Sequence, residues 1–155
     1  MSPRKHDWAS LQTYLNAHER VLRTYSKFMD HPVQYKQSRV TENYLILECQ
    51  SIFTTYNGTK VRVDIYKDVE IDDSILNRER ALTFGYSYNA NRPGVGNLLR
   101  YDSPDPPAEI SPSTPAHHRF HHKHDWSSGT EVIVKIPDDE WPHVDQFFQE
   151  VLTRF

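Results

Sequence analysis

Five of the nine histidines in this chain lie in one short stretch, HHRFHHKHD at positions 117–125, which we call the histidine block. Imidazole gains and loses a proton near neutral pH, and neutral imidazole is the commonest metal ligand in proteins. Arg119 and Lys123 stand among these histidines. The histidine block therefore predicts an acid/base site, a metal site, or a polar loop without chemistry.

The first alternative is acid/base catalysis. One neutral and one protonated histidine can abstract and donate protons near pH 7. We assign these roles to His122 and His124, which project to the same side of an extended chain. Arg119 and Lys123 would bind a phosphate and stabilise the charge that develops on it. This combination predicts metal-independent RNA cleavage, in which the 2′-hydroxyl is the nucleophile.

The second alternative is a divalent metal such as zinc. His118, His122 and His124 share one side of an extended chain and are the ligands expected in that case. Arg119 and Lys123 would repel the cation, and the chain contains no HExxH motif. If a metal is bound, the protein would be a metal-binding protein or a metal-dependent hydrolase. Otherwise we expect no cofactor.

A second polar group stands at the end of the segment LLRYD. Arg100 can hold a phosphate or pair with Asp102, and Asp102 can fix the tautomer of a histidine. An ordinary ion pair at the end of a strand is the alternative. We predict that Asp102 acts with the catalytic histidines. The predicted substrate-binding residues are Arg100, Tyr101, Arg119 and Lys123.

Helices are expected at both ends of the chain. Apolar residues at helical spacing predict an amphipathic helix over residues 7–30, with Asp7 as its N-cap. Residues 137–155 predict a second helix, capped by Asp138 or Asp139, with Pro142 in its first turn.

Five strands are expected between these helices. Val61, Val63 and Ile65 alternate with polar residues, and Asn57-Gly58 is a strong hairpin signal. Another alternating pattern predicts one shared face for Leu82, Phe84, Tyr86 and Tyr88. The predicted strands cover residues 43–56, 60–66, 81–90, 97–102 and 130–136.

These elements predict a single α+β domain over residues 1–155: a five-stranded, mainly antiparallel meander with both helices packed on one face. Residues 103–116 contain five of the ten prolines and predict an extended or flexible arm. We expect this proline-rich arm and the histidine block to lie over the other face, among Tyr and Arg residues.

Composition limits the classes of function. The net charge of −3 does not indicate nucleic-acid binding by overall charge, so RNA would need a local patch. Cys49 is the only cysteine, which excludes an intramolecular disulfide or a multi-cysteine zinc site. The chain shows neither a leader-like apolar start nor a membrane-spanning run, so we expect a cytoplasmic protein.

The segment LLRYDSPDP, followed by FHHKHD, a strand and a helix, resembles the TumE-type toxins of prokaryotic toxin–antitoxin modules. That family carries an RYDN-x-P stretch and then a PHHKH stretch. The segment GYSYNA resembles the family's YSY strand, and the resemblance covers roughly residues 45–153. By position, RYD is matched by Arg100, Tyr101 and Asp102, and HHKH by His121, His122, Lys123 and His124.

The chain departs from this pattern in several places. Ser103 replaces the family's asparagine, Asp105-Pro106 replace a pair of histidines, and Phe120 replaces a proline. His117-His118 stand where they can substitute for the missing pair. The resemblance implies a growth-inhibiting toxin that cleaves RNA and pairs with a small helix-turn-helix antitoxin. A non-enzymatic module that binds RNA or protein through a Tyr-rich sheet is the remaining alternative, and the sequence leaves homo-oligomer formation open.

Overall fold

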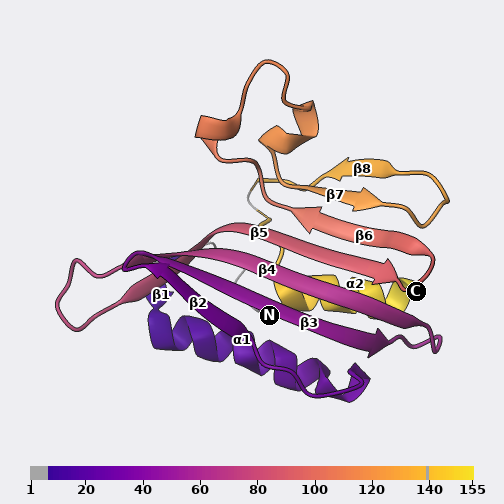
Figure 1. Ribbon diagram of the computed structural model, residues 1–155, viewed down its shortest axis with the longest axis horizontal. Coiled ribbons are helices and arrows are strands. Elements are labelled where there is room, and N and C mark those ends of the chain that lie inside the picture. Colours follow the sequence, from indigo (N-terminus) through magenta and orange to yellow (C-terminus); the bar gives the residue numbers. More distant parts are fainter. Residues whose placement is uncertain (1–6, 139) are drawn as a thin grey trace.

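The computed structural model describes residues 7–138 and 140–155. Its centre is an antiparallel sheet of eight strands with both helices on one face (Figure 1). Strand β1 (Ala9–Ser10) pairs with β5, and the other strands pair in chain order. They are β2 (Lys36–Thr41), β3 (Tyr44–Thr54), β4 (Lys60–Asp72), β5 (Arg80–Arg92), β6 (Gly96–Asp102), β7 (His122–Asp125) and β8 (Val132–Lys135).

The predicted α+β class and meander are confirmed, but the predicted number of five strands is too low. Strands β1, β2 and β7 were not predicted because none has a run of alternating apolar residues. Strand β2 is mostly exposed, and β7 is formed by the histidine block itself. Among the described residues, no helix is long and apolar enough to cross a membrane.

Helix α1 (Leu11–Tyr25) is shorter than predicted. Its N-cap is Ser10, whose hydroxyl accepts a hydrogen bond from the Thr13 N–H at 3.1 Å, so the prediction of Asp7 was wrong. Residues 9–10 are extended because they pair with β5. The helix ends before a 3₁₀ turn, η1 (Ser26–Phe28).

Helix α2 (Val144–Arg154) also begins later than predicted. His143 is its N-cap and forms a capping box with Gln146. Asp138 lies in the preceding connection, so it is not the cap, and Asp139 lies outside the described residues. Pro142 precedes the helix instead of occupying its first turn.

The core lies between the sheet and the two helices. Val61, Val63 and Ile65 are buried as predicted, and the alternate residues of β3 are buried beside them. Phe147 and Phe148 of α2 are fully buried against this layer. Each such side chain contributes about 1.5–3 kcal/mol by leaving water.

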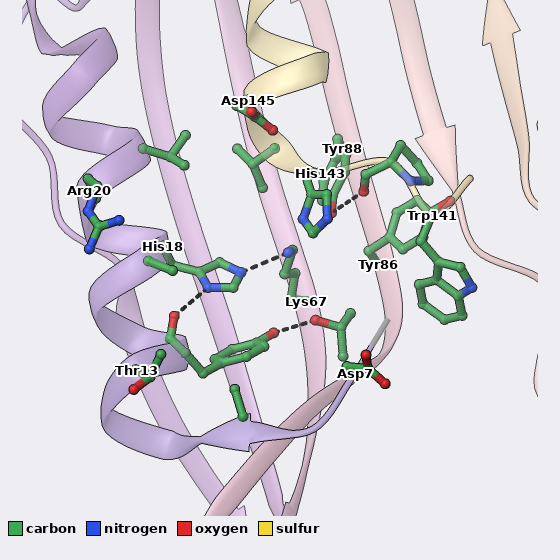
Figure 2. A pocket seen from close by; sticks show the side chains of 17 residues that line it. Asp7, Thr13, His18, Arg20, Lys67, Tyr86, Tyr88, Trp141, His143 and Asp145 are labelled. Carbon is green, nitrogen blue, oxygen red and sulfur yellow. Dashed lines mark hydrogen bonds between the residues drawn. The ribbon is translucent and has the colours of Figure 1, made fainter. Parts of the chain in front are cut away.

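A β-bulge changes the predicted face of β5. Asp68 pairs with Gly85 and Val69 pairs with Thr83, so Phe84 is an extra residue. Phe84 is 44% exposed, whereas Tyr86 and Tyr88 are buried on the helix side, beside Lys67 (Figure 2). The prediction of one shared face was therefore wrong. A Cβ at Gly85 would lie 2.8 Å from Asp68 Oδ2, so a larger residue there would require the Asp68 carboxylate to move.

The proline-rich arm contains the 3₁₀ turn η2 (Pro107–Glu109) and leads into η3 (Ala116–Arg119). The Ser103 N–H donates to the Tyr86 carbonyl at 3.1 Å, and the Asp105 N–H donates to the His118 carbonyl at 2.8 Å. The arm therefore returns the chain to the edge of β6, where the histidine block begins (Figure 1).

Candidate functional site

Pairing between β6 and β7 brings the two polar motifs of the sequence together. Asp102 lies opposite His122, and Arg100 lies opposite His124. Residues directly opposite each other in an antiparallel pair project to the same face of the sheet. Tyr101, between Arg100 and Asp102, packs against Phe147 of α2. The other four side chains therefore lie on the face away from the helices.

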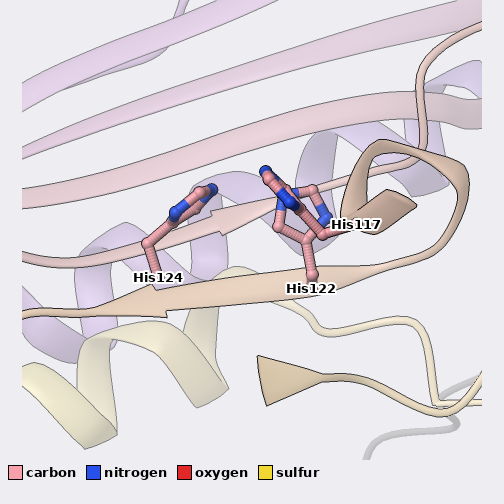
Figure 3. Close-up of side chains that lie close together, drawn as sticks. All are labelled: His117, His122 and His124. Atoms are coloured by element: carbon pink, nitrogen blue, oxygen red, sulfur yellow. The ribbon is translucent and has the colours of Figure 1, made fainter. Parts of the chain in front are cut away.

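Three imidazoles converge on this face (Figure 3). The ring centroids of His122 and His124 are 5.0 Å apart. The ring centroid of His117 lies 5.0 Å from that of His122 and 5.3 Å from that of His124. One nitrogen of each ring lies within 4.8 Å of the others. We call these three residues the histidine cluster.

The histidine cluster contains His117 where the sequence predicted His118. The extended conformation expected for residues 117–124 was wrong for its first part, because Ala116–Arg119 form the 3₁₀ turn η3. His118 instead places Nδ1 3.0 Å from Asp105 Oδ2 and stacks on His122 at 5.9 Å. The turn directs His117, from outside the strand, toward the strand pair.

Hydrogen bonds define the tautomers of both strand histidines. The Nδ1 of His122 donates to the Phe120 carbonyl at 2.9 Å, because that oxygen can only accept. The Nδ1 of His124 donates to Glu131 Oε1 at 2.5 Å. In the neutral form of these rings each Nε2 carries a lone pair, and these atoms lie 3.9 and 3.7 Å from Asp102 Oδ2.

Asp102 is in turn held by Arg100. The Arg100 Nε lies 2.8 and 3.0 Å from the two carboxylate oxygens, and the guanidinium side chain is about half exposed, at 48%. Both residues line a cavity of about 410 Å³ that also includes Asp68 and Asp105. Three carboxylates and one guanidinium therefore line the cavity together with the two histidines of β7, and this excess of negative charge favours a cation there.

Burial favours the neutral form of two members of the histidine cluster, because it lowers the pKa of His117 and of His122. It lowers the pKa of His122, and the neighbouring histidines lower it further against the opposing effects of the Phe120 carbonyl and Asp102. Burial and the other histidines also lower the pKa of His117. Neutral imidazole is the form that binds a metal.

Three of the four predicted substrate-binding residues lie away from this cavity. Lys123 and Tyr101 face α2, where the Tyr101 hydroxyl donates to Glu150 and Lys123 Nζ lies 3.0 Å from Glu150 Oε1. Arg119 donates to the Ser111 carbonyl at 3.0 Å on the surface. Arg100 is the member of that set that lines the cavity.

His121, which matches the first histidine of HHKH, also faces away from the cavity. It is buried, and its Nδ1 lies 2.7 Å from the Tyr86 hydroxyl. Its ring packs against Trp141 at 4.4 Å. His121 is therefore part of the core, not of the histidine cluster.

Sequence reasoning missed Glu131 and the ligand position of His117. Glu131 reaches His124 because β7 and β8 form a hairpin in which Asp125 pairs with Val132. The sequence signal for this hairpin was Gly129 in the polar turn SSGT, which stands between two extended segments. No comparable local signal identifies His117, since a 3₁₀ turn brings it into place.

Comparison of the chain with protein-family models, curated proteins and solved structures found no match. The resemblance to the TumE-type toxins therefore stays a prediction.

Replacing Lys123 with methionine should affect stability and leave the histidine cluster intact. The variant loses the ion pair with Glu150, so we expect unfolding to become easier by about 1 kcal/mol. Urea unfolding and the NMR signals of the His122 and His124 imidazoles would measure the two effects. Shifted imidazole signals with unchanged stability would contradict the observed orientation of Lys123.

Proposed function

We propose that the protein is a metal-dependent hydrolase whose metal is held by His117, His122 and His124. The observation that carries this proposal is the direction of the lone pairs. His122 and His124 use Nδ1–H for the Phe120 carbonyl and for Glu131, so both direct Nε2 toward one point. Acceptor atoms that converge beside a carboxylate form a site that a cation can fill.

Zinc is the first candidate for this cation. Its sites combine imidazole ligands at about 2.0–2.1 Å, so that tetrahedral ligand atoms lie roughly 3.4 Å apart. The nitrogens of the histidine cluster lie within 4.8 Å of one another, a spacing that small ring rotations can reduce. Metal-bound histidines commonly donate their other N–H to a carboxylate or a backbone carbonyl, as His124 and His122 do here.

Three protein ligands and an open fourth position are the arrangement of catalytic zinc sites. Zinc in such a site supplies a water of lowered pKa and polarises the bond to be broken. Asp102 Oδ2 lies 3.7 Å from His124 Nε2 and 3.9 Å from His122 Nε2. We infer that Asp102 would accept a proton from a water activated by the bound metal, and that Arg100 orients its carboxylate.

Arg100 also indicates the class of substrate. Its guanidinium is about half exposed at the cavity, and guanidinium binds phosphate oxygens well. A phosphodiester, such as the RNA backbone, would place its negative charge between Arg100 and the metal. This substrate agrees with the resemblance to the TumE-type toxins, for which a helix-turn-helix antitoxin is the expected partner.

Metal-independent RNA cleavage is the second candidate. It is favoured by the paired His122 and His124, whose rings lie 5.0 Å apart in the same cavity as Arg100. One histidine would abstract the proton of the 2′-hydroxyl, and the other, protonated, would donate to the leaving oxygen. This mechanism requires one of two adjacent imidazoles to carry a charge.

A chelator experiment separates the two candidates. The untagged protein is expected to be purified with about one equivalent of zinc, and to cleave single-stranded RNA. Chelation should abolish cleavage, and added zinc should restore it. Cleavage that continues in the metal-free protein would overturn the metal proposal and support the second candidate. Absence of both zinc binding and cleavage would overturn both.

Glu131 offers an independent prediction. Replacing it with alanine removes the acceptor of His124 Nδ1–H, so the affinity for zinc should fall about 10- to 100-fold. The matched control is Glu109→Ala in η2, where the glutamate is exposed and away from the histidine cluster. Competition with a chromophoric chelator measures both affinities. Equal affinities would mean that Glu131 does not position His124.

A further inference from the structure

A second cavity lies on the helix side of the sheet, away from the histidine cluster (Figure 2). Its volume is about 480 Å³. Its walls come from α1, β4, β5 and the segment 141–145 that leads into α2. Most of the lining surface is carbon, and the aromatic walls are Tyr14, Tyr86, Tyr88 and Trp141.

Lys67 projects from β4 into this cavity (Figure 2). Only 3% of the residue is exposed to solvent. Its Nζ donates to His18 Nε2 at 2.7 Å, because His18 Nδ1–H is already donated to the Tyr14 carbonyl at 2.8 Å. Burial and the nearby Lys67 lower the pKa of His18 well below its usual range. His18 is therefore a neutral acceptor and brings no counter-charge.

Lys67 also has no carboxylate partner in the part of the chain that the structure describes, since none lies within 4.0 Å of its Nζ. Asp145 lines the cavity and opposes the effect of burial on the pKa of Lys67 from a greater distance. Buried charges in proteins are normally paired with an opposite charge. The cavity therefore contains a buried amine that no carboxylate of the described residues contacts, although Asp7 and Asp145 also line its wall.

We propose that this cavity binds a small apolar carboxylic acid, with its carboxylate paired to Lys67 and its hydrocarbon part packed between α1 and the sheet. The single amine matches one negative charge. A phosphate or a sugar would need several buried donors, and Lys67 and the Tyr14–Thr83 hydroxyl pair are few. Arg20 and Thr13 also line the cavity, but both are exposed. The carbon-rich walls match an alkyl or aryl body. This inference is independent of the proposed hydrolase.

Calorimetric titration of the whole protein with decanoate tests this proposal, with decan-1-ol and acetate as probes of each half of the ligand. We expect saturable binding of decanoate at one site. Decan-1-ol should bind at least about tenfold more weakly, because it lacks the charge-assisted contact. Acetate should not bind measurably, since it lacks the apolar body.

Two variants assign the binding to the cavity. The Lys67→Met substitution should lower the affinity for decanoate at least about tenfold and leave the affinity for decan-1-ol unchanged. The Val21→Phe substitution fills part of the cavity and should lower both affinities. The matched control, Lys60→Met, removes an exposed lysine of the same strand and should change neither. No decanoate binding to the wild type, or equal binding to Lys67→Met, would overturn the proposal. If Lys67→Met does not fold, two other results test the proposal: the preference of the wild type for decanoate over decan-1-ol, and the loss of binding in Val21→Phe. Absence of either result would then overturn it.

Discussion

Replacement of His122 by alanine is expected to abolish zinc binding and RNA cleavage together. His122 is 2% exposed, and its ring centroid lies 5.0 Å from those of the other two members of the histidine cluster. Removal of a metal ligand should lower the zinc affinity more than removal of a residue that only orients a ligand, such as Glu131. We therefore expect the zinc affinity to fall by more than about 100-fold. Cleavage should fall at least as far. Equilibrium dialysis and an RNA degradation assay measure the two losses.

The matched control for this variant is His118→Ala. His118 belongs to the same segment and the same cavity, but its Nδ1 is bound to Asp105 and it lies outside the histidine cluster. The His118→Ala variant should therefore bind zinc with the affinity of the wild type. Because removal of a buried His122 also weakens packing, His124→Ala serves as a second variant, and circular dichroism verifies the fold of each.

The outcomes of these variants also separate the mechanisms. Joint loss of zinc and cleavage supports the metal proposal. Loss of cleavage with normal zinc affinity would mean that the histidines act as acid and base instead of as ligands. Normal zinc affinity and normal cleavage in both His122→Ala and His124→Ala would contradict both assignments.

The central strands could be predicted because one of their faces is buried. Val61, Val63 and Ile65 alternate with polar residues, and only one register places them all in the core. Strand β2 carries no such pattern, since neither of its faces is covered to the same extent. The bulge at Phe84 is likewise not a property of the local pattern, because it depends on the partner strand β4.

The candidate site was predictable only in part. Alternation along β7 correctly places His122 and His124 on one side, and it places Lys123 on the other, facing Glu150. A phosphate-binding role for Lys123 disregarded that alternation. The contribution of His117 depends on the turn η3, and that of Asp102 depends on the register between β6 and β7. Neither can be obtained from spacing along the chain.

The largest pH effect on stability is expected from Lys67. Burial lowers its pKa in the folded protein from 10.5 to about 7. Between these two values the unfolded chain binds a proton that the folded chain does not. The contribution of Lys67 to the free energy of unfolding therefore rises with pH across this window, by about 1.4 kcal/mol per pH unit where only the unfolded lysine is protonated.

Comparison of the wild type with Lys67→Met isolates this effect. The variant lacks the buried amine, so its stability relative to the wild type should be greater at pH 7 than at pH 9. This relative stability should decrease by about 2 kcal/mol between pH 7 and pH 9. Urea unfolding at several pH values measures it. Other groups that titrate in this range, such as Cys49, are common to both proteins and cancel in the difference.

The change of this difference with pH is the informative quantity, because Lys67→Met also removes the donor to His18 and alters packing near Tyr88. Those losses do not vary with pH above the pKa of His18, whereas the charge of Lys67 does. Lys60→Met, in which an exposed and ion-paired lysine is lost, should differ from the wild type by the same amount at pH 7 and at pH 9. A constant difference for Lys67→Met would mean that its ammonium keeps its charge in the folded protein. The cavity would then already stabilise the charged ammonium, and a ligand carboxylate would not be needed to do so.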